Sequence, residues 1–289
     1  MRTPTAVLTT MRPWQWIKNL LVVAAPLAAG KIFAPDVVVP TAIAFVAFCL
    51  MASAVYCIND AADVEADRLH PTKRTRPIAA GHLSVSAAIA AAAVLAGASL
   101  LLAWTTGWAL VVLLTIYLAL QVGYAKWFKH EPVIDLAVVV SGFLLRAVAG
   151  GLAAHLPISE WFLLVAGFGA LFMVSGKRYS ELHTIGSEAG TRKALVRYSA
   201  TYLRFVWSAA AAVTLVAYSL WAFEQARHSV IPWHTASIAA FTLGMLRYAV
   251  DIDAGKASAP EDIVYGDRAL QVIGLVWFVL VGLGVLGVG

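Results

Sequence analysis

Three carboxylates, Asp60, Asp63 and Asp67, are the residues whose types and spacing best suit chemistry, and they lie in the stretch NDAADVEADR. Their spacing of three and four residues puts them within about 60° of one another on one face of a predicted helix. Carboxylates this close repel one another unless a cation lies between them. Oxygen ligands suit Mg²⁺, which takes one or two carboxylates together with water and phosphate oxygens. We therefore predict that these three residues bind Mg²⁺ and act in catalysis.

Two neighbours of this carboxylate stripe bear on the same hypothesis. Asn59 adds a neutral amide oxygen at its start, whereas Glu65 points away from the shared face and is expected in solvent. The alternative is a solvated acidic turn at a membrane surface. Because the stripe directly follows an apolar segment, a functional site is the favoured interpretation.

Basic residues follow the carboxylates within a dozen positions, in the stretch HPTKRTRPIAAG. Lys73, Arg74 and Arg76 lie between Pro71 and Pro77, which stiffen the loop. A phosphate-rich ligand would use both features, because Mg²⁺ bridges some of its oxygens while Lys and Arg bind others. The alternative is that these cations only set the membrane orientation of the chain.

A second charged cluster, GKRYSELH, runs from Gly176 to His183. Lys177 and Glu181 are i, i+4 neighbours on a predicted helix, with Arg178 beside them, and a simple ion pair worth a few tenths of a kcal/mol is the alternative to a binding role. Two such clusters on one membrane side predict a shared cavity. A third possible wall of that cavity is EDIVYGDR, which contains Glu261, Asp262, Asp267 and Arg268.

These clusters are positioned by a chain composed for a membrane. Of its 289 residues 61% are hydrophobic and 13% are charged, whereas a soluble domain averages about 25% charged residues. Apolar runs of about 20 residues recur, which is the length a helix needs to cross the hydrocarbon layer. We predict an all-α integral membrane protein that forms a single domain over residues 1–289. The nine predicted spans lie at residues 15–34, 37–58, 84–104, 107–125, 133–153, 160–176, 203–222, 231–250 and 269–288.

The distribution of charge predicts the orientation of the chain. If loops alternate from the N-terminus, eighteen of the 21 Lys and Arg residues fall on one side, against Lys31 and Arg227 on the other. The positive side is cytoplasmic, so the N-terminus and the site are predicted in the cytoplasm and the C-terminus outside the cell membrane. Thirteen of the sixteen carboxylates share the cytoplasmic side, which orientation alone does not require. Cys49 and Cys57 fall on one span and are not expected to form a disulfide.

The motif NDAADVEADR after the second span, the stretch YAKWFK at the end of the fourth and the nine spans together resemble the UbiA superfamily of intramembrane prenyltransferases. The resemblance covers nearly the whole chain. It implies a helical bundle around a central cavity that opens to the cytoplasm. Most members carry a second Asp-rich motif that helps to bind an isoprenyl diphosphate. This chain departs from that pattern, because GKRYSELH stands there with one carboxylate and two cations.

This departure, with RPWQWIKNLLVVAAPL and HPTKRTRPIAAG, resembles a branch that transfers phosphoribosyl from phosphoribosyl pyrophosphate to polyprenyl (decaprenyl) phosphate for cell-wall arabinan precursors. The resemblance implies Mg²⁺ as cofactor and those two molecules as partners within the bilayer. No nucleic-acid partner is expected, and a homo-oligomer is left open. The substrate-binding residues predicted with this resemblance are Lys18, Asn59, Lys73, Arg76, Tyr124, Lys129, Lys177, Arg178 and Glu181.

Two alternatives stay open at this point. An ordinary UbiA-type prenyltransferase would move an isoprenyl chain to an aromatic or other acceptor, but it should use a second Asp-rich motif. A transporter would place charges in mid-span on facing helices, and here Arg146 is the clear mid-span charge.

Overall fold

The computed structural model describes residues 3–185, 197–226, 231–258, 263 and 265–287. Within these residues all regular structure is helical, as predicted, and no strand occurs. Seven helices are long and apolar enough to cross a membrane, which indicates a multi-pass membrane protein. They are α3 (Pro35–Ala62), α5 (Val85–Trp104), α6 (Trp108–Lys126), α7 (Ile134–Ala153), α8 (Glu160–Ile185), α10 (Ala200–Ala226) and α13 (Arg268–Val285).

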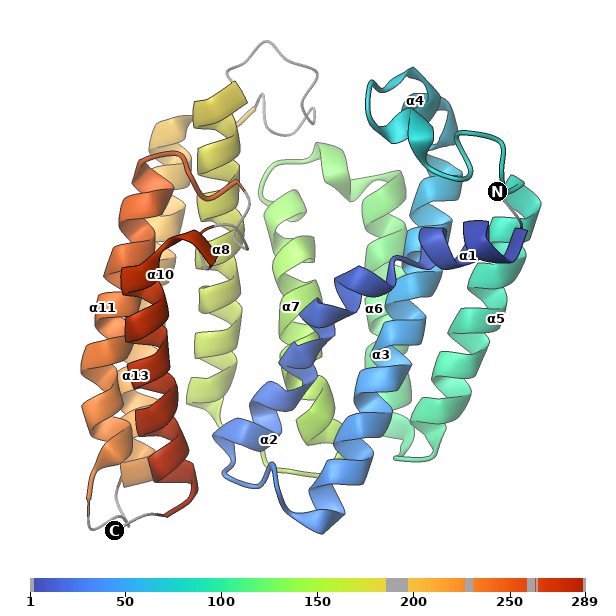
Figure 1. Ribbon diagram of the computed structural model, residues 1–289. Coiled ribbons are helices and arrows are strands. Elements are labelled where there is room, and N and C mark those ends of the chain that lie inside the picture. The colour runs from blue at the N-terminus through green and yellow to red at the C-terminus, as the bar shows by residue number, and fades with distance from the viewer. Residues whose placement is uncertain (1–2, 186–196, 227–230, 259–262, 264, 288–289) are drawn as a thin grey trace. The chain divides into compact units, whose positions relative to one another are not determined.

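The chain divides into two compact units, of which the first contains residues 1–26, 32–128 and 145–157. Here α3 packs along α5 and α6 (Figure 1). Small residues allow the close approach, since Ala47 and Ala92 are buried and the Ser99 hydroxyl of α5 donates to the Ala47 carbonyl of α3 at 2.7 Å. The shorter elements of this unit are α1 (Thr3–Met11), the 3₁₀ helices η1 (Pro13–Val23) and η2 (Lys73–Thr75), and α4 (Val64–Leu69).

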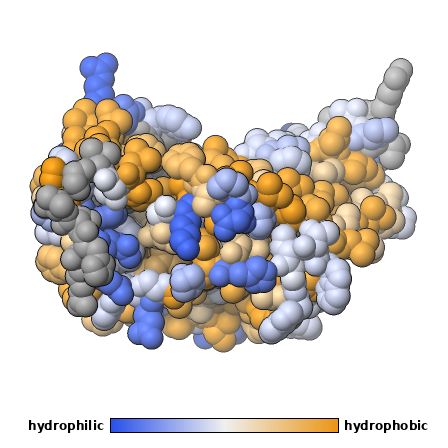
Figure 2. Space-filling view, turned by 90° about the horizontal axis from the view of Figure 1, so that it is seen from below, coloured by the Kyte–Doolittle hydropathy of each residue, from blue (hydrophilic) through white to orange (hydrophobic). Residues whose placement is uncertain are grey.

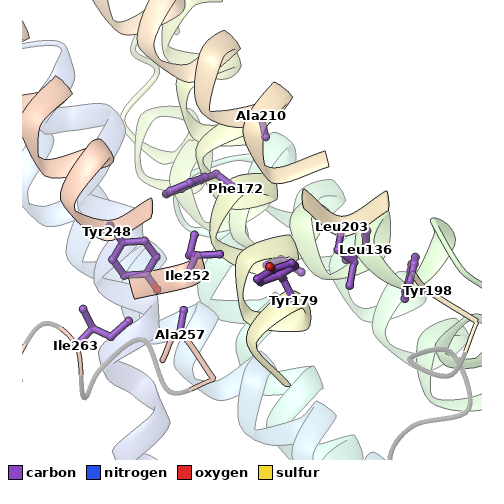
Figure 3. Close-up of a cluster of buried hydrophobic side chains, with 11 residues drawn as sticks. Leu136, Phe172, Tyr179, Tyr198, Leu203, Ala210, Tyr248, Ile252, Ala257 and Ile263 are labelled. Atoms are coloured by element: carbon purple, nitrogen blue, oxygen red, sulfur yellow. The ribbon is translucent and has the colours of Figure 1, made fainter. Parts of the chain in front are cut away.

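The second unit contains residues 27–31, 129–144 and 158–289. Here α10 packs against α8, and α11 (Trp233–Asp253) packs against both α10 and α13 (Figure 1). Its core contains large side chains such as Phe172, Tyr248 and Ile252 (Figure 3). At Gly176 a Cβ atom would collide with the Ile252 side chain, so glycine lets α8 lie close to α11 just before the charged residues begin.

Large apolar side chains remain exposed along several spans. Leu101 of α5, Phe205 of α10 and Leu275 of α13 are each more than half exposed. On the face shown in Figure 2, apolar residues are widespread and hydrophilic residues form separate patches. In a membrane protein such side chains face lipid, which is as apolar as they are.

The predicted span at residues 15–34 is wrong as a continuous helix. Arg12 has a left-handed backbone (φ 52°) before Pro13, η1 follows, and α2 (Ala24–Ala28) is short. Pro26 lacks the N–H that would bond the Val22 carbonyl, and this carbonyl lies where a Cβ atom on Gly150 would be. The chain therefore crosses this region in two short pieces.

The other eight predicted spans coincide with helices to within a few residues, apart from the longer α8. The range 231–250 corresponds to α11, which is not among the seven apolar helices because it carries polar side chains such as His234, Arg247 and Asp251. The predicted count of nine spans is therefore not confirmed, and the single domain stays a prediction. Cys49 and Cys57 are both free and buried, which confirms the expectation for them.

Candidate active site

In the first unit, a cluster of two arginines and two carboxylates forms at the end of α3. Asp60 lies in the last turn of α3 and is only 4% exposed. The Arg12 guanidinium donates to Asp60 Oδ1 at 2.6 Å, and Arg76 Nη1 donates to the same oxygen at 3.1 Å. The same Arg76 nitrogen also donates to Asp67 Oδ2 at 2.7 Å. Arg76 thus brings Asp60 and Asp67 together, as their predicted common face required. We call Arg12, Arg76, Asp60 and Asp67 the carboxylate cluster.

Local structure explains how each side chain reaches the carboxylate cluster. Arg76 follows η2 directly, and the next apolar residue, Ile78, is buried with Leu83 and small residues of α1, α3 and α5. This packing holds the end of the loop against the helices. Arg12 also lies over the Tyr56 ring at 5.0 Å, a cation–π contact that orients its guanidinium.

The predicted continuous carboxylate stripe is interrupted at its middle residue. Asp63 has backbone angles of φ −95° and ψ 8°, so α3 ends before it and α4 begins after it. Asp favours helix ends over helix interiors because its side chain competes for nearby backbone groups. The backbone bonds from Asp63 to Asn59 and from Asp67 to Asp63 persist at 3.0 and 2.8 Å. The break is therefore small, and Asp63 stays half-buried beside the cluster.

Asn59 holds a buried polar atom without a partner. Its Oδ1 has no hydrogen-bond partner among the described residues. Such an orphaned acceptor needs an explanation, and a bound ion or ligand is one. Glu65 is exposed and pairs with Arg68 at 2.9 Å, in agreement with its predicted solvation. Across the residues that the structure describes, no three His, Cys, Asp or Glu side chains form a ready-made metal cage.

The other predicted binding residues of the first unit lie on η1, η2 and α6. Lys18 is exposed on η1, and Lys73 is exposed on η2. Tyr124 is half-buried near the end of α6. Their substrate roles stay predictions.

In the second unit, a cluster forms around one arginine of α8. Arg178 is buried and donates twice to Asp135 of α7, from Nε to Oδ2 at 3.2 Å and from Nη2 to Oδ1 at 3.4 Å. Its Nη1 donates to Glu181 Oε2 at 2.9 Å. The alternative of a simple ion pair between Lys177 and Glu181 is not what the structure records, because the recorded partner of Glu181 is Arg178. We call Asp135, Arg178 and Glu181 the arginine cluster.

Two lysines near the arginine cluster differ from Arg178 in their burial. Lys177 is half-buried, and its ammonium forms no ion pair within the described residues. Lys129 is half-buried on the 3₁₀ helix η3 (Phe128–His130). Of the proposed third wall, Glu261 and Asp262 lie outside the described residues. Asp267 accepts hydrogen bonds from two backbone N–H groups at the start of α13 and pairs with Arg247.

Sequence reasoning missed two residues of these sites, Arg12 and Asp135. Arg12 stands in the quoted stretch RPWQWIKN, and its position before a proline was the available signal. Asp135 opens a predicted span, where a carboxylate is unusual. Arg146 was noticed in mid-span, and the structure shows it bonded to Asn19 at 2.8 Å and to Tyr117 at 2.8 Å in the first unit.

The geometry defines an all-helical multi-pass membrane protein with charged clusters at the ends of its helices. The family model of the UbiA prenyltransferase family matches residues 20–262. The chain therefore belongs to the UbiA prenyltransferase family.

Two relatives and one solved structure extend this result. The chain is 51% identical over 279 residues to the decaprenyl-phosphate phosphoribosyltransferase of Corynebacterium glutamicum, covering 94% of this chain and 84% of that protein. It is 48% identical to the protein of the same name from Mycobacterium tuberculosis, covering 96% and 94%. A UbiA homologue from Archaeoglobus fulgidus bound to DMAPP and Mg²⁺ has a TM-score of 0.74 at 18% identity, covering 98% and 99%. This last likeness shows a shared fold.

Proposed function

We propose that this protein transfers the 5-phosphoribosyl group from phosphoribosyl pyrophosphate to a polyprenyl phosphate, with decaprenyl phosphate as the expected lipid. The products are pyrophosphate and polyprenylphosphoryl-5-phosphoribose, and the latter supplies arabinan precursors of a cell wall. The observation that carries the proposal is the 47–51% identity, over nearly the whole chain, to proteins named for this transfer.

The carboxylate cluster is the proposed Mg²⁺ site. Mg²⁺ prefers oxygen ligands and binds through one or two carboxylates plus substrate phosphates, rather than in an all-protein cage. Asp60 and Asp67 converge, Asp63 lies beside them, and Asn59 Oδ1 is an orphaned buried acceptor. These donors fit such an ion. When bound, it would stabilise the negative charge of the departing pyrophosphate.

Cations of both units are the proposed phosphate ligands. Lys177 is the strongest candidate of the second unit, because Arg178 is already bonded to two carboxylates. Arg76 of the first unit lies at the proposed metal site, where a guanidinium can bind a phosphate in a bidentate manner. Further contacts to the two substrates are proposed for Lys18, Asn59, Lys73, Tyr124, Lys129, Arg178 and Glu181.

The proposed chemistry needs positioning more than proton transfer. The lipid phosphate is already an anion, so it can attack the anomeric carbon without a general base. As the new C–O bond forms, the bond to pyrophosphate breaks, and attack opposite the leaving group inverts the anomeric centre. Residues that hold both anions in line supply most of the rate.

The site is proposed to face the cytoplasm, where phosphoribosyl pyrophosphate is dissolved. Cysteine labelling tests this orientation, because the native Cys49 and Cys57 are buried. Leu69→Cys and Phe33→Cys each place a cysteine at an exposed position, and the two positions lie on opposite predicted sides of the membrane. In intact cells an impermeant maleimide should label only Phe33→Cys, and the reverse pattern contradicts the orientation.

The reaction itself is tested with membranes that contain the protein, labelled phosphoribosyl pyrophosphate, polyprenyl phosphate and Mg²⁺. We expect label to become extractable into organic solvent, and chelation to stop the transfer until Mg²⁺ is restored. Membranes without the protein are the control. If the protein instead transfers an isoprenyl group from its diphosphate to an aromatic acid, the ordinary prenyltransferase alternative is correct.

A further inference from the structure

A cavity of about 540 Å³ lies in the second unit, between the end of α11 and the start of α13. Its charged lining consists of Arg247, Asp251, Lys256, Asp267 and Arg268. Its volume falls in the range of small-molecule sites. None of these five residues belongs to the carboxylate cluster or the arginine cluster.

Asp251 provides the strongest sign that this cavity takes a ligand. Its side chain is 7% exposed, and its Oδ2 has no hydrogen-bond partner within the described part of the chain. A buried carboxylate oxygen without a donor is costly to the folded state. Arg247, one helical turn earlier, donates instead to Asp267. Asp251 lines the cavity, and its Oδ2 is a buried acceptor there without a donor among the described residues.

The backbone fixes a cation beside this carboxylate. Gly255 has a left-handed backbone (φ 72°), and its N–H donates to Ile252 O at 2.9 Å. The N–H of Lys256 donates to the carbonyl of Asp251, also at 2.9 Å. These two bonds form the Schellman ending of a helix. The motif holds the backbone of Lys256 next to that of Asp251.

Counted over the described residues, the lining of the cavity has three cations and two carboxylates, which is an excess of positive charge. Arg247 and Asp267 neutralise each other, and Asp267 also caps α13. Lys256 and Arg268 remain exposed at the cavity, with no ion pair recorded among the described residues. Lys256 and Arg268 match a phosphate anion, and the unpartnered oxygen of Asp251 matches a hydrogen-bond donor on a group next to that phosphate.

The flanks of the cavity favour a lipid as the source of that phosphate. On α11, Leu246 and Val250 are more than half exposed, and on α13 so are Val272 and Leu275. Both apolar flanks lead away from the charged lining along helices that end at the cavity. Basic pockets between membrane helices are known to hold phospholipid headgroups.

We propose that the cavity between α11 and α13 binds an anionic phospholipid with headgroup hydroxyls. Its phosphate diester contacts Lys256 and Arg268, and a headgroup hydroxyl donates to Asp251 Oδ2. Phosphatidylglycerol has this chemistry. Phosphatidylmethanol is the matched comparison, because it has the same phosphate diester and charge but lacks the headgroup hydroxyls.

Native mass spectrometry of the detergent-solubilised full chain tests the proposal with these two lipids. We expect saturable binding of both, with phosphatidylglycerol bound roughly tenfold more tightly, because a hydrogen bond to a carboxylate contributes about that much. Asp251→Asn should reduce this preference strongly. Lys256→Ala and Arg268→Ala should weaken the binding of both lipids, whereas Arg197→Ala, an exposed cation elsewhere in the unit, should change neither.

A second experiment, with a water-soluble ligand, distinguishes a lipid headgroup from a free phosphate ester. Glycerol phosphate, added to lipid-free protein, should not shift the melting temperature at concentrations where phosphatidylglycerol does. The proposal is overturned if glycerol phosphate stabilises the protein as well as the lipid does. It is equally overturned if the Asp251, Lys256 and Arg268 variants, checked for normal melting, bind both lipids as the unmodified protein does.

Discussion

In the first unit two arginines converge on one carboxylate oxygen, since Arg12 and Arg76 both donate to Asp60. In the second unit two carboxylates converge on one arginine, since Asp135 and Glu181 both bind Arg178. Both clusters lie at helix ends and both are largely buried. They differ in which sign of charge stands at the centre.

This difference indicates what each cluster can exchange. A carboxylate surrounded by cations can trade one of those cations for a metal ion, because the incoming charge has the same sign. An arginine held by two carboxylates has its charge already compensated, so an anion would have to displace a carboxylate. We therefore propose that the carboxylate cluster binds the metal ion, and that Lys177 is a stronger candidate than Arg178 for the anion ligand of the second unit.

The largest expected effect follows from neutralising the centre of the carboxylate cluster. Asp60→Asn and Asp67→Asn should each lower turnover roughly 100-fold or more, since each removes a charge that stabilises the transition state. Phosphoribosyl transfer and circular dichroism should be measured on the same preparations. Glu65→Gln is the matched control, because Glu65 lies on the same short helix as Asp67 and is exposed. Near-normal turnover in both Asp variants would contradict the metal assignment.

Removing Arg178, the centre of the arginine cluster, should lower the free energy of unfolding more than it affects the catalytic step. Arg178→Met removes the guanidinium that is bonded to the buried Asp135, which should cost about 3–5 kcal/mol of unfolding free energy. The double variant Asp135→Asn, Arg178→Met should recover much of that loss. Thermal unfolding in detergent measures both. If Arg178→Met unfolds like the unmodified protein but no longer binds phosphoribosyl pyrophosphate, Arg178 is the anion ligand after all.

Lys177 should show the opposite behaviour to Arg178. Lys177→Ala should raise the KM for phosphoribosyl pyrophosphate more than tenfold, in line with about 2 kcal/mol or more for a charge-assisted contact to a buried anion. The KM for the lipid and the melting temperature should stay nearly unchanged. Lys126→Ala, another cation at a helix end, is the control. An equal rise in both KM values would point to a general electrostatic effect and not to a donor contact.

The smallest expected effect concerns the partly exposed pair of Arg247 and Asp267, in contrast to the buried pair of Arg178 and Asp135. Hydrogen bonds from Arg247 and from the N–H groups of α13 hold the pKa of Asp267 below its ordinary value. Its stabilisation is therefore complete above the unfolded-state pKa and is lost as the pH falls through the lower folded-state pKa. When the melting temperature is measured as a function of pH, Asp267→Asn should show a slightly smaller fall on acidification than the unmodified protein. A large change near neutral pH would contradict this account.

Helix positions in this protein could be predicted from the sequence because hydrophobic run length is a local property. Eight predicted spans coincide with α3, α5, α6, α7, α8, α10, α11 and α13. The failure at residues 15–34 has a local cause and a non-local one. The local cause is that Pro13 and Pro26 limit helical hydrogen bonding there. The non-local cause is that Arg12, whose backbone is left-handed, contacts Asp60 and Tyr56 with its side chain.

The candidate site was predictable where one segment supplies the residues. Asp60 and Asp67 share a face because seven residues make nearly two helical turns, and the small break at Asp63 does not separate them. The partner of Glu181 was not predictable in the same way. Lys177 and Arg178 are both within helical reach of it, and Asp135, more than forty residues away, binds Arg178.

The sequence by itself determined the helical membrane fold, the family and the stripe of carboxylates, because each depends on composition or on spacing within one segment. Only the tertiary structure decided which cation meets which carboxylate. Arg12 reaches Asp60 across 48 residues and Arg178 reaches Asp135 across 43. An ion pair of this kind forms where packed helices bring two side chains within about 3 Å in a dry environment, and no local spacing encodes that distance.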